Sequence, residues 1–92
     1  MAQTHSLKSW PQFFHAIVAG DRTHELRRND RNFRVGDLLV LAEFDPLVEE
    51  YTGATCTAEV TSITSSDIEC AVSKEALHPD FCILSVKVIA TV

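Results

Sequence analysis

The feature of this 92-residue sequence that most restricts its possible folds is a set of short segments in which apolar and polar residues alternate. In residues 54–63, ATCTAEVTSI, apolar and polar residues alternate almost strictly, which is the period of a β-strand with one buried face. Turn-forming residues separate this segment from the other expected strands, which are residues 4–8, 22–28, 38–44, 68–72 and 81–90. Five or six short strands at this spacing predict a small closed or nearly closed barrel.

One substantial helix is expected early in the chain, over residues 9–19. Ser9 can act as its N-cap, Pro11 suits its first turn, and Gly20 stands where a left-handed C-terminal cap is expected. The side chains expected to pack inward are Phe13, Phe14, Ile17 and Val18. The fold class is therefore α+β, with mostly antiparallel strands and one main helix near the N-terminus.

Size and composition indicate a single soluble domain. The chain is too short for two domains, and its 46% hydrophobic and 23% charged residues are ordinary for a globular protein. No apolar run approaches the roughly 20 residues that cross a bilayer, and the first residues lack the regions of a signal peptide. Three cysteines without a CxxC spacing suggest a reducing compartment. We therefore expect a cytoplasmic protein with no membrane partner.

The cations are concentrated in one segment of an acidic chain. The formal net charge is −5, yet five of the eight lysines and arginines lie within residues 22–34. These five are Arg22, Arg27, Arg28, Arg31 and Arg34. This asymmetry predicts one basic patch on an acidic body, which favours a polyanionic partner at one place.

Two interpretations of this basic segment remain open. Guanidinium groups match phosphate oxygens in a bidentate way, so Arg27, Arg28 and Arg31 are candidates for phosphate binding. Alternatively, they belong to a solvated turn with ion pairs to Glu25 and Asp30. Asn29, between them, is either a polar contact or a turn former.

Two aromatic residues could stack on a base. Trp10, beside Lys8 at the start of the expected helix, is the sole tryptophan, and Tyr51 lies in an expected loop. The alternative for Trp10 is a hydrophobic plug at the helix start. The four histidines fit no structural zinc spacing, so no metal or other cofactor is expected.

Residues 7–46 resemble the signature of small bacterial and phage proteins with an activating-signal-cointegrator homology (ASCH) domain, which belongs to the PUA-like superfamily. The matching elements are LKxWPxxFxAIxxG, ExRxNDRxFxVGDxLxL and the YTG of residues 51–53. The resemblance implies that residues 1–92 form one ASCH domain, a PUA-like β-barrel with a ligand cleft between the barrel and the first helix. It also implies a role in binding RNA or a nucleotide.

This chain departs from the family pattern at two positions. The family motif GxKxxExR carries a lysine where this chain has Arg22, and Ala54 follows YTG where many relatives carry arginine. Some ASCH proteins resemble amidohydrolases that deacylate acetylated cytidine with that lysine. Arginine stays protonated, so Arg22 is a poor general base, although it can hold an oxyanion or a phosphate.

Three functions therefore remain. The favoured one is a binding module for single-stranded RNA or a nucleotide, in which Glu25 can form a hydrogen bond with the edge of a base. The alternative is a small hydrolase, of amidohydrolase or ribonuclease type, in which Glu25 is the acid or base and Arg22 stabilises charge. The third is a protein-interaction adaptor. Strand alternation predicts that Glu25 and Arg27 line one cleft beside Lys8, with Leu26 packed on the core. Arg22 has the opposite parity, but it directly follows the Gly20 cap, where its side chain can turn towards the same cleft. The full candidate set is Lys8, Trp10, Arg22, Glu25, Arg27, Arg28, Asn29, Arg31 and Tyr51.

Overall fold

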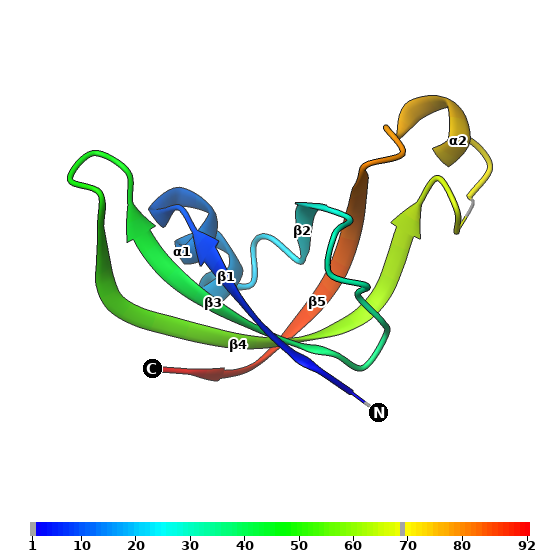
Figure 1. Cartoon of the computed structure of the whole chain (residues 1–92). Coiled ribbons are helices and arrows are strands. Elements are labelled where there is room, and N and C mark those ends of the chain that lie inside the picture. Colours follow the sequence, from blue (N-terminus) through cyan, green and yellow to red (C-terminus); the bar gives the residue numbers. More distant parts are fainter. Residues whose placement is uncertain (1, 69) are drawn as a thin grey trace.

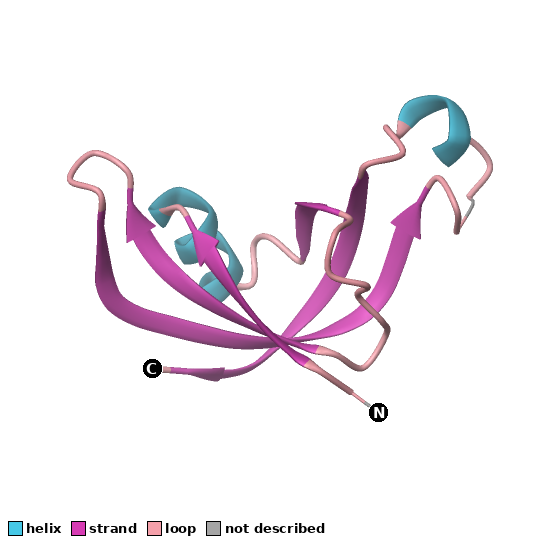
Figure 2. Cartoon of the chain, in the orientation of Figure 1, coloured by secondary structure: helices cyan, strands magenta, loops and turns pink. Residues whose placement is uncertain are grey.

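One curved five-stranded sheet frames the protein in the computed structural model, which describes residues 2–68 and 70–92. The strand order is β1-β3-β4-β5-β2. The strands are β1 (Thr4–Ser9), β2 (His24–Arg28), β3 (Leu38–Asp45), β4 (Glu50–Ser65) and β5 (Phe81–Thr91). Helix α1 (Pro11–Ala19) follows β1, and the one-turn helix α2 (Ser73–Ala76) precedes β5. Figure 2 shows that strands dominate the fold.

The sheet is mixed and bends into a half-barrel. β1 pairs with β3 in parallel, whereas the pairs β3–β4, β4–β5 and β2–β5 are antiparallel. The long strand β4 runs along the bend, and α1 lies on the concave side (Figure 1). Register shifts interrupt the pairing of β4 with both neighbours, and such bulges increase local twist and curvature. The expected α+β class with mostly antiparallel strands agrees with this arrangement, apart from the parallel β1–β3 pair.

The two edge strands, β1 and β2, are joined by arginine side chains. Arg27 Nη2 donates to the Lys8 carbonyl at 2.8 Å, and Arg31 Nη1 donates to the Ser6 carbonyl at 2.8 Å. Both carbonyls lie at the free edge of β1, where an unpaired strand is open to association with another chain. Two residues of the basic segment therefore connect the two edges of the open sheet.

Helix α1 packs on the sheet through a narrower face than the sequence suggested. Phe14 and Ile17 are buried, but Phe13 is 38% exposed and Val18 is 41% exposed. The expectation of a four-residue apolar face is wrong for Phe13 and Val18, because only positions three apart on this short helix face the sheet. The buried core around Phe14 and Ile17 comprises Leu7, Phe33, Leu39, Leu41, Cys56, Ala58, Val60, Cys82, Leu84 and Val86.

The structure confirms some of the predicted helix caps and strand limits and shows that others are wrong. Gly20 has φ of 83° and forms the left-handed cap, as expected. Ser9 is not the N-cap, because it ends β1 opposite Glu43 and leaves Trp10 at the cap position. The described residues of 68–72 form no strand. Tyr51 lies in β4 rather than in a loop, since its backbone pairs with Phe44.

A buried carboxylate fixes the start of β1 to the turn before β3. Asp37 is 1% exposed, and it accepts hydrogen bonds from the Gln3 and Arg34 backbone N–H groups at 2.9 and 3.0 Å. His5 Nε2 lies 2.9 Å from Oδ2, the oxygen that also accepts from Arg34, whereas Gln3 donates to Oδ1. Burial alone raises the pKa of Asp37, but the hydrogen bonds from Gln3, His5 and Arg34 outweigh burial and lower this pKa below 3.8.

We expect Asp37→Asn to lower the free energy of unfolding by about 1.5–3 kcal/mol at neutral pH, because hydrogen bonds to a charged acceptor are lost. A lowered folded-state pKa stabilises the fold above the unfolded pKa, near 3.8, and this contribution disappears as pH falls through the folded value. Urea unfolding measured between pH 7 and acid should show the decline in the wild type and a smaller one in Asp37→Asn. Parallel pH profiles would contradict this assignment.

Candidate functional site

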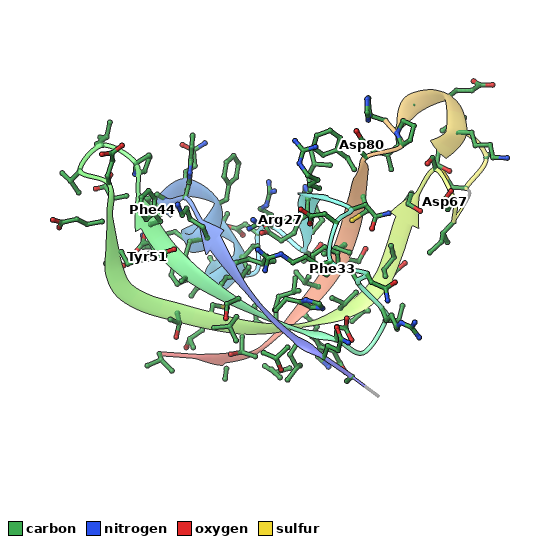
Figure 3. The ribbon with its side chains drawn as sticks, in the orientation of Figure 1. Arg27, Phe33, Phe44, Tyr51, Asp67 and Asp80 are labelled. Carbon is green, nitrogen blue, oxygen red and sulfur yellow. The ribbon has the colours of Figure 1, made fainter. Side chains whose placement is uncertain are left out.

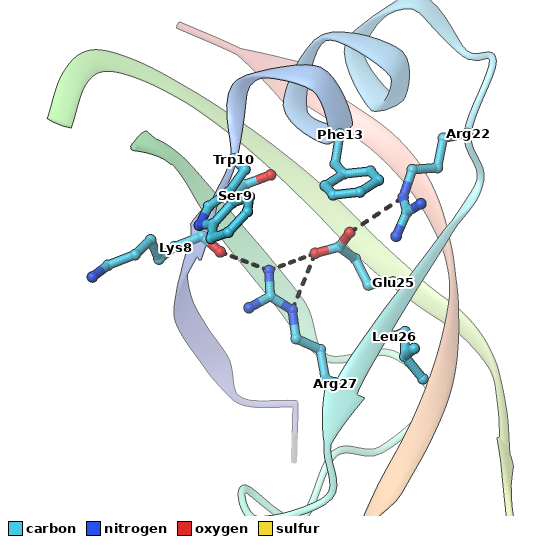
Figure 4. A pocket seen from close by; sticks show the side chains of 8 residues that line it. All are labelled: Lys8, Ser9, Trp10, Phe13, Arg22, Glu25, Leu26 and Arg27. Carbon is cyan, nitrogen blue, oxygen red and sulfur yellow. Dashed lines mark hydrogen bonds and ion pairs between the residues drawn. The ribbon is translucent and has the colours of Figure 1, made fainter. Parts of the chain in front are cut away.

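An open pocket of about 290 Å³ lies between the end of β1, the start of α1 and the strand β2 (Figure 4). Its lining combines two aromatic rings, two guanidinium groups and one carboxylate. The lining residues are Lys8, Ser9, Trp10, Phe13, Arg22, Glu25, Leu26 and Arg27.

Glu25 is the buried centre of this pocket. The alternation of β2 turns Glu25 and Arg27 to the same face, and Glu25 is only 3% exposed. Arg27 donates from Nη2 and Nε to Glu25 Oε1 at 2.6 and 3.1 Å, while Arg22 Nε lies 3.6 Å from Oε2 (Figure 4). The expected Glu25–Arg27 pair is therefore confirmed. A buried carboxylate needs such partners, since its desolvation is otherwise costly.

The arginines reach the pocket from two different directions. Arg27 comes from β2, and its bond to the Lys8 carbonyl holds its guanidinium across the pocket floor. Arg22 follows the Gly20 cap, where its backbone N–H donates to the Ala16 carbonyl at 3.1 Å. Its guanidinium carbon lies 4.5 Å from the centre of the Phe13 ring, a cation–π distance. The expected convergence of Arg22, Glu25 and Arg27 beside Lys8 agrees with this geometry.

Two aromatic side chains of the helix start face β2 across the pocket. Trp10 is 52% exposed and Phe13 is 38% exposed, and Figure 4 shows both rings on the side opposite Glu25 and Arg27. Exposed aromatic faces beside donors and acceptors are suited to a flat polar ligand, which can stack on the rings and hydrogen-bond at its edge. Phe13 was expected in the core, so sequence reasoning missed its place here.

Unsatisfied polar atoms coincide with this pocket. Among the buried side-chain atoms of residues 2–68 and 70–92, only Ser9 Oγ and Arg22 Nε lack a hydrogen-bond partner. Both residues line the pocket. A buried unsatisfied group costs about 1–3 kcal/mol, which a ligand hydrogen bond would offset. Because Ser9 was expected to be the helix N-cap, it was not among the candidate site residues predicted from the sequence.

Two predicted site residues direct their functional groups elsewhere. Lys8 lies on the outward face of β1, and its Nζ is 4.0 Å from the centre of the Phe44 ring. The ring of Tyr51 packs against Phe44 with centroids 5.1 Å apart, outside the pocket (Figure 3). Lys8 therefore contributes its backbone carbonyl to the pocket floor through Arg27. Leu26, expected in the core, is 56% exposed, because the inward face of β2 carries Glu25 and Arg27.

The other basic candidates surround a second, smaller pocket. This pocket has a volume of about 140 Å³ and is lined by Leu7, Arg27, Arg28, Asp30, Arg31 and Phe33. Asn29 lines neither pocket, and its backbone N–H donates to the Asp80 carbonyl at 2.7 Å. Arg27 thus belongs to both pockets, as a shared wall.

A further histidine–carboxylate pair lies outside both pockets. His15 Nε2 lies 2.7 Å from Glu43 Oε2, and the Thr52 hydroxyl donates to Glu43 Oε1 at 2.7 Å. In the described part of the chain, no group of three histidine, cysteine or acidic side chains could hold a metal ion. In that part of the chain, no helix combines the length and the apolar character needed to span a bilayer.

Residues 4–86 match the family described as "Domain of unknown function (DUF3850)". The chain belongs to this family. It is also 34% identical over 64 residues to the "Uncharacterized 12.9 kDa protein in GpA 3'region" of Escherichia phage P2, a match that covers 70% of this chain. The match spans 57% of the length of that phage protein. Every residue of both pockets falls within the DUF3850 match.

We expect Glu25→Gln to lower the free energy of unfolding by about 2–3 kcal/mol, because it leaves two guanidiniums without their shared carboxylate. The effect should stay below that of a fully buried pair, since both arginines are partly exposed. Glu50→Gln, at an exposed position of β4, is the matched control and should change stability by less than about 0.5 kcal/mol. Chemical unfolding of the three proteins measures the difference, and equal losses in both variants would contradict a structural role for Glu25.

Proposed function

We propose that this protein is a binding module for a nucleotide or for a base of single-stranded RNA, held in the 290 Å³ pocket. The observation that carries the proposal is the buried Glu25 carboxylate beneath the exposed rings of Trp10 and Phe13. A carboxylate accepts hydrogen bonds from base amino and imino groups, and aromatic rings stack on base faces. The pocket therefore offers complementary contacts to both the edge and the face of a base.

The arginines add a second part to this recognition. In the empty pocket Arg27 neutralises Glu25, and a ligand that approaches the pair can recruit guanidinium donors while the carboxylate accepts from the base. Arg22 Nε and Ser9 Oγ supply two further groups without hydrogen-bond partners. A ligand with acceptors along one edge and donors along another would satisfy all of these groups.

The resemblance to ASCH proteins supports the same assignment. That resemblance implies a PUA-like barrel with a ligand cleft between the barrel and the first helix. The curved mixed sheet with α1 on its concave side is compatible with a small barrel-like fold, and the pocket lies between α1 and β2. Trp10, Glu25 and Arg27 belong both to the motifs that carry this resemblance and to the lining of the pocket.

A small hydrolase acting on a modified nucleoside or on single-stranded RNA is the second candidate. The unpaired Ser9 hydroxyl and Glu25 line the same pocket and are groups that such chemistry uses. Binding is favoured over turnover, because Arg22 replaces the family lysine and no described side chain accepts a proton from Ser9 Oγ.

Binding and turnover should be measured on the same samples. Trp10 is the only tryptophan, so its fluorescence reports directly on the pocket. We expect nucleotides and short single-stranded RNA to change this fluorescence in a saturable way while the ligands are recovered unchanged by chromatography. A reaction product among the recovered ligands would favour the hydrolase. If no nucleoside, nucleotide or RNA binds, the protein-interaction adaptor becomes the favoured function.

Arg27→Ala should weaken nucleotide binding by about 1.5–3 kcal/mol, the contribution of a hydrogen bond to a charged group. Arg34→Ala removes the same charge outside both pockets and should bind as the wild type does. Arg27→Lys retains the charge without the bidentate geometry and should lie between them, which keeps the test valid if Arg27→Ala folds poorly. If Arg27→Ala binds the nucleotide as tightly as the wild type does, Arg27 is not part of the binding site.

Trp10→Ala should weaken binding by about 1–3 kcal/mol if a base stacks on the indole. Tyr51→Ala is a matched control, because Tyr51 is similarly exposed at 58% but lies outside the pocket. Isothermal titration calorimetry compares the two without relying on tryptophan fluorescence. Equal losses in both variants would argue that the base does not stack at the start of α1.

A further inference from the structure

The two pockets lie on either side of one side chain. Arg27 pairs with Glu25 in the larger pocket and also lines the smaller pocket with Arg28 and Arg31. We propose that the smaller pocket binds a phosphate attached to the base held in the larger pocket, so that the ligand is a nucleotide unit and not a free nucleoside. This inference rests on the proposed function and names the part of the ligand that the first pocket leaves unassigned.

The three guanidiniums of the smaller pocket retain unpaired donors. Arg31 uses only Nη1, for the Ser6 carbonyl, and Arg27 uses only Nε and Nη2. Arg28 has its guanidinium carbon 5.0 Å from the centre of the Phe81 ring and donates no hydrogen bond to another described residue. At least one nitrogen of each arginine is therefore available to an anion without breaking an existing bond.

The local charge also favours an anion. Asp30 is the only acid that lines this pocket, and no ion pair connects it to an arginine within the part of the chain that the structure describes. Because Arg27 is already paired with Glu25, Arg28 and Arg31 against one carboxylate leave an excess of one positive charge beside a wall formed by Leu7 and Phe33. This corrects the alternative in which Asp30 neutralises the basic turn. Guanidinium clusters of this kind recognise phosphate oxygens through charge-assisted, bidentate hydrogen bonds.

Two anchoring interactions keep these arginines in place. The Arg31–Ser6 hydrogen bond connects the segment after β2 to the edge of β1. The Arg27–Lys8 hydrogen bond connects β2 to the same edge, two residues further along β1. Arg28 is held against Phe81 of β5, the neighbour of β2. Figure 3 shows Arg27 and Phe33 on the same concave side of the half-barrel. Prearranged donors of this type lose little side-chain entropy when an anion binds.

The size difference between the pockets agrees with this division of roles. The larger pocket, about 290 Å³, carries the aromatic rings and the carboxylate, whereas the smaller one, about 140 Å³, carries no exposed aromatic face and is mostly cationic. A phosphate on either the 5′ or the 3′ oxygen, or within a phosphodiester, presents the same chemistry to the arginines. The experiment must therefore distinguish these three sources.

The test compares a nucleoside with its 5′-monophosphate, its 3′-monophosphate and a dinucleotide, titrated against the wild type and followed by Trp10 fluorescence. We expect at least one phosphorylated ligand to bind about ten- to a hundredfold more tightly than the nucleoside. Arg28→Ala and Arg31→Ala should each reduce this advantage, measured as the ratio of phosphorylated-ligand affinity to nucleoside affinity in the same variant. Arg34→Ala, the charge-matched control, should preserve the advantage.

Each result has a defined reading. Equal affinity for the nucleoside and all phosphorylated ligands overturns the phosphate pocket but leaves the base-binding function intact. A phosphate advantage that survives in both Arg28→Ala and Arg31→Ala also overturns it, because the phosphate then binds elsewhere. If no nucleoside or nucleotide binds, the proposed function itself fails. The best phosphorylated ligand identifies the position of the phosphate.

Salt dependence gives an independent readout on a single-stranded RNA oligonucleotide. Each neutralised phosphate of a single strand contributes a slope of about −0.7 to a plot of log affinity against log salt, so one phosphate in the smaller pocket predicts a contribution of about −0.7. Arg28→Ala should reduce the magnitude of the slope, and Arg34→Ala should leave it unchanged. Salt-independent binding in the wild type would overturn the phosphate pocket.

Discussion

A carboxylate removed from water must have positive charge beside it, and in this protein that carboxylate is Glu25. Arg27 supplies the closest charge, and the same guanidinium donates to the backbone of β1 on the opposite edge of the sheet. One side chain thereby neutralises the buried acid, spans the open side of the half-barrel and forms the wall between the two pockets. Removing either partner would affect the fold, the electrostatics and the shape of both pockets together.

This arrangement explains why an acidic chain collects its arginines in one segment. Arg22 and Arg27 compensate a buried acid, Arg27 and Arg31 satisfy carbonyls at a sheet edge, and Arg28 and Arg31 present donors to a second pocket. The two interpretations of the basic segment are therefore not exclusive. Structural ion pairing accounts for part of each side chain's bonding capacity, and the donors that remain are the basis for proposing a phosphate ligand.

Strand alternation made much of the fold predictable from the sequence. It placed most strands correctly, and it put Glu25 and Arg27 on one face of β2. Alternation does not say which face lies inward, so Leu26 was assigned to the core when the paired polar residues occupy that side. The same limit applies to Lys8, whose ammonium lies over Phe44 on the outside of β1. These choices depend on partners contributed by distant strands.

Contacts between residues far apart in the chain also could not be predicted from the sequence. Asp37 follows Gly36 in the turn before β3, and no local motif indicates its partners Gln3 and His5, which lie more than thirty positions earlier. Ser9 looked like a helix cap, because the parallel pairing of β1 with β3 cannot be read from a local motif. Both residues follow ordinary local rules, and only tertiary pairing gives them other roles.

The strand order has a consequence for how the two pockets form during folding. The pockets are walled by β1 and β2, which occupy opposite ends of the sheet and pair with partners far along the chain, as in Thr4 with Leu38 and Arg28 with Phe81. Neither wall can form from local contacts, and such non-local pairings are slow to assemble. The site should therefore be absent from any partly folded species. A molecule that binds it would act as a selective stabiliser of the completed chain.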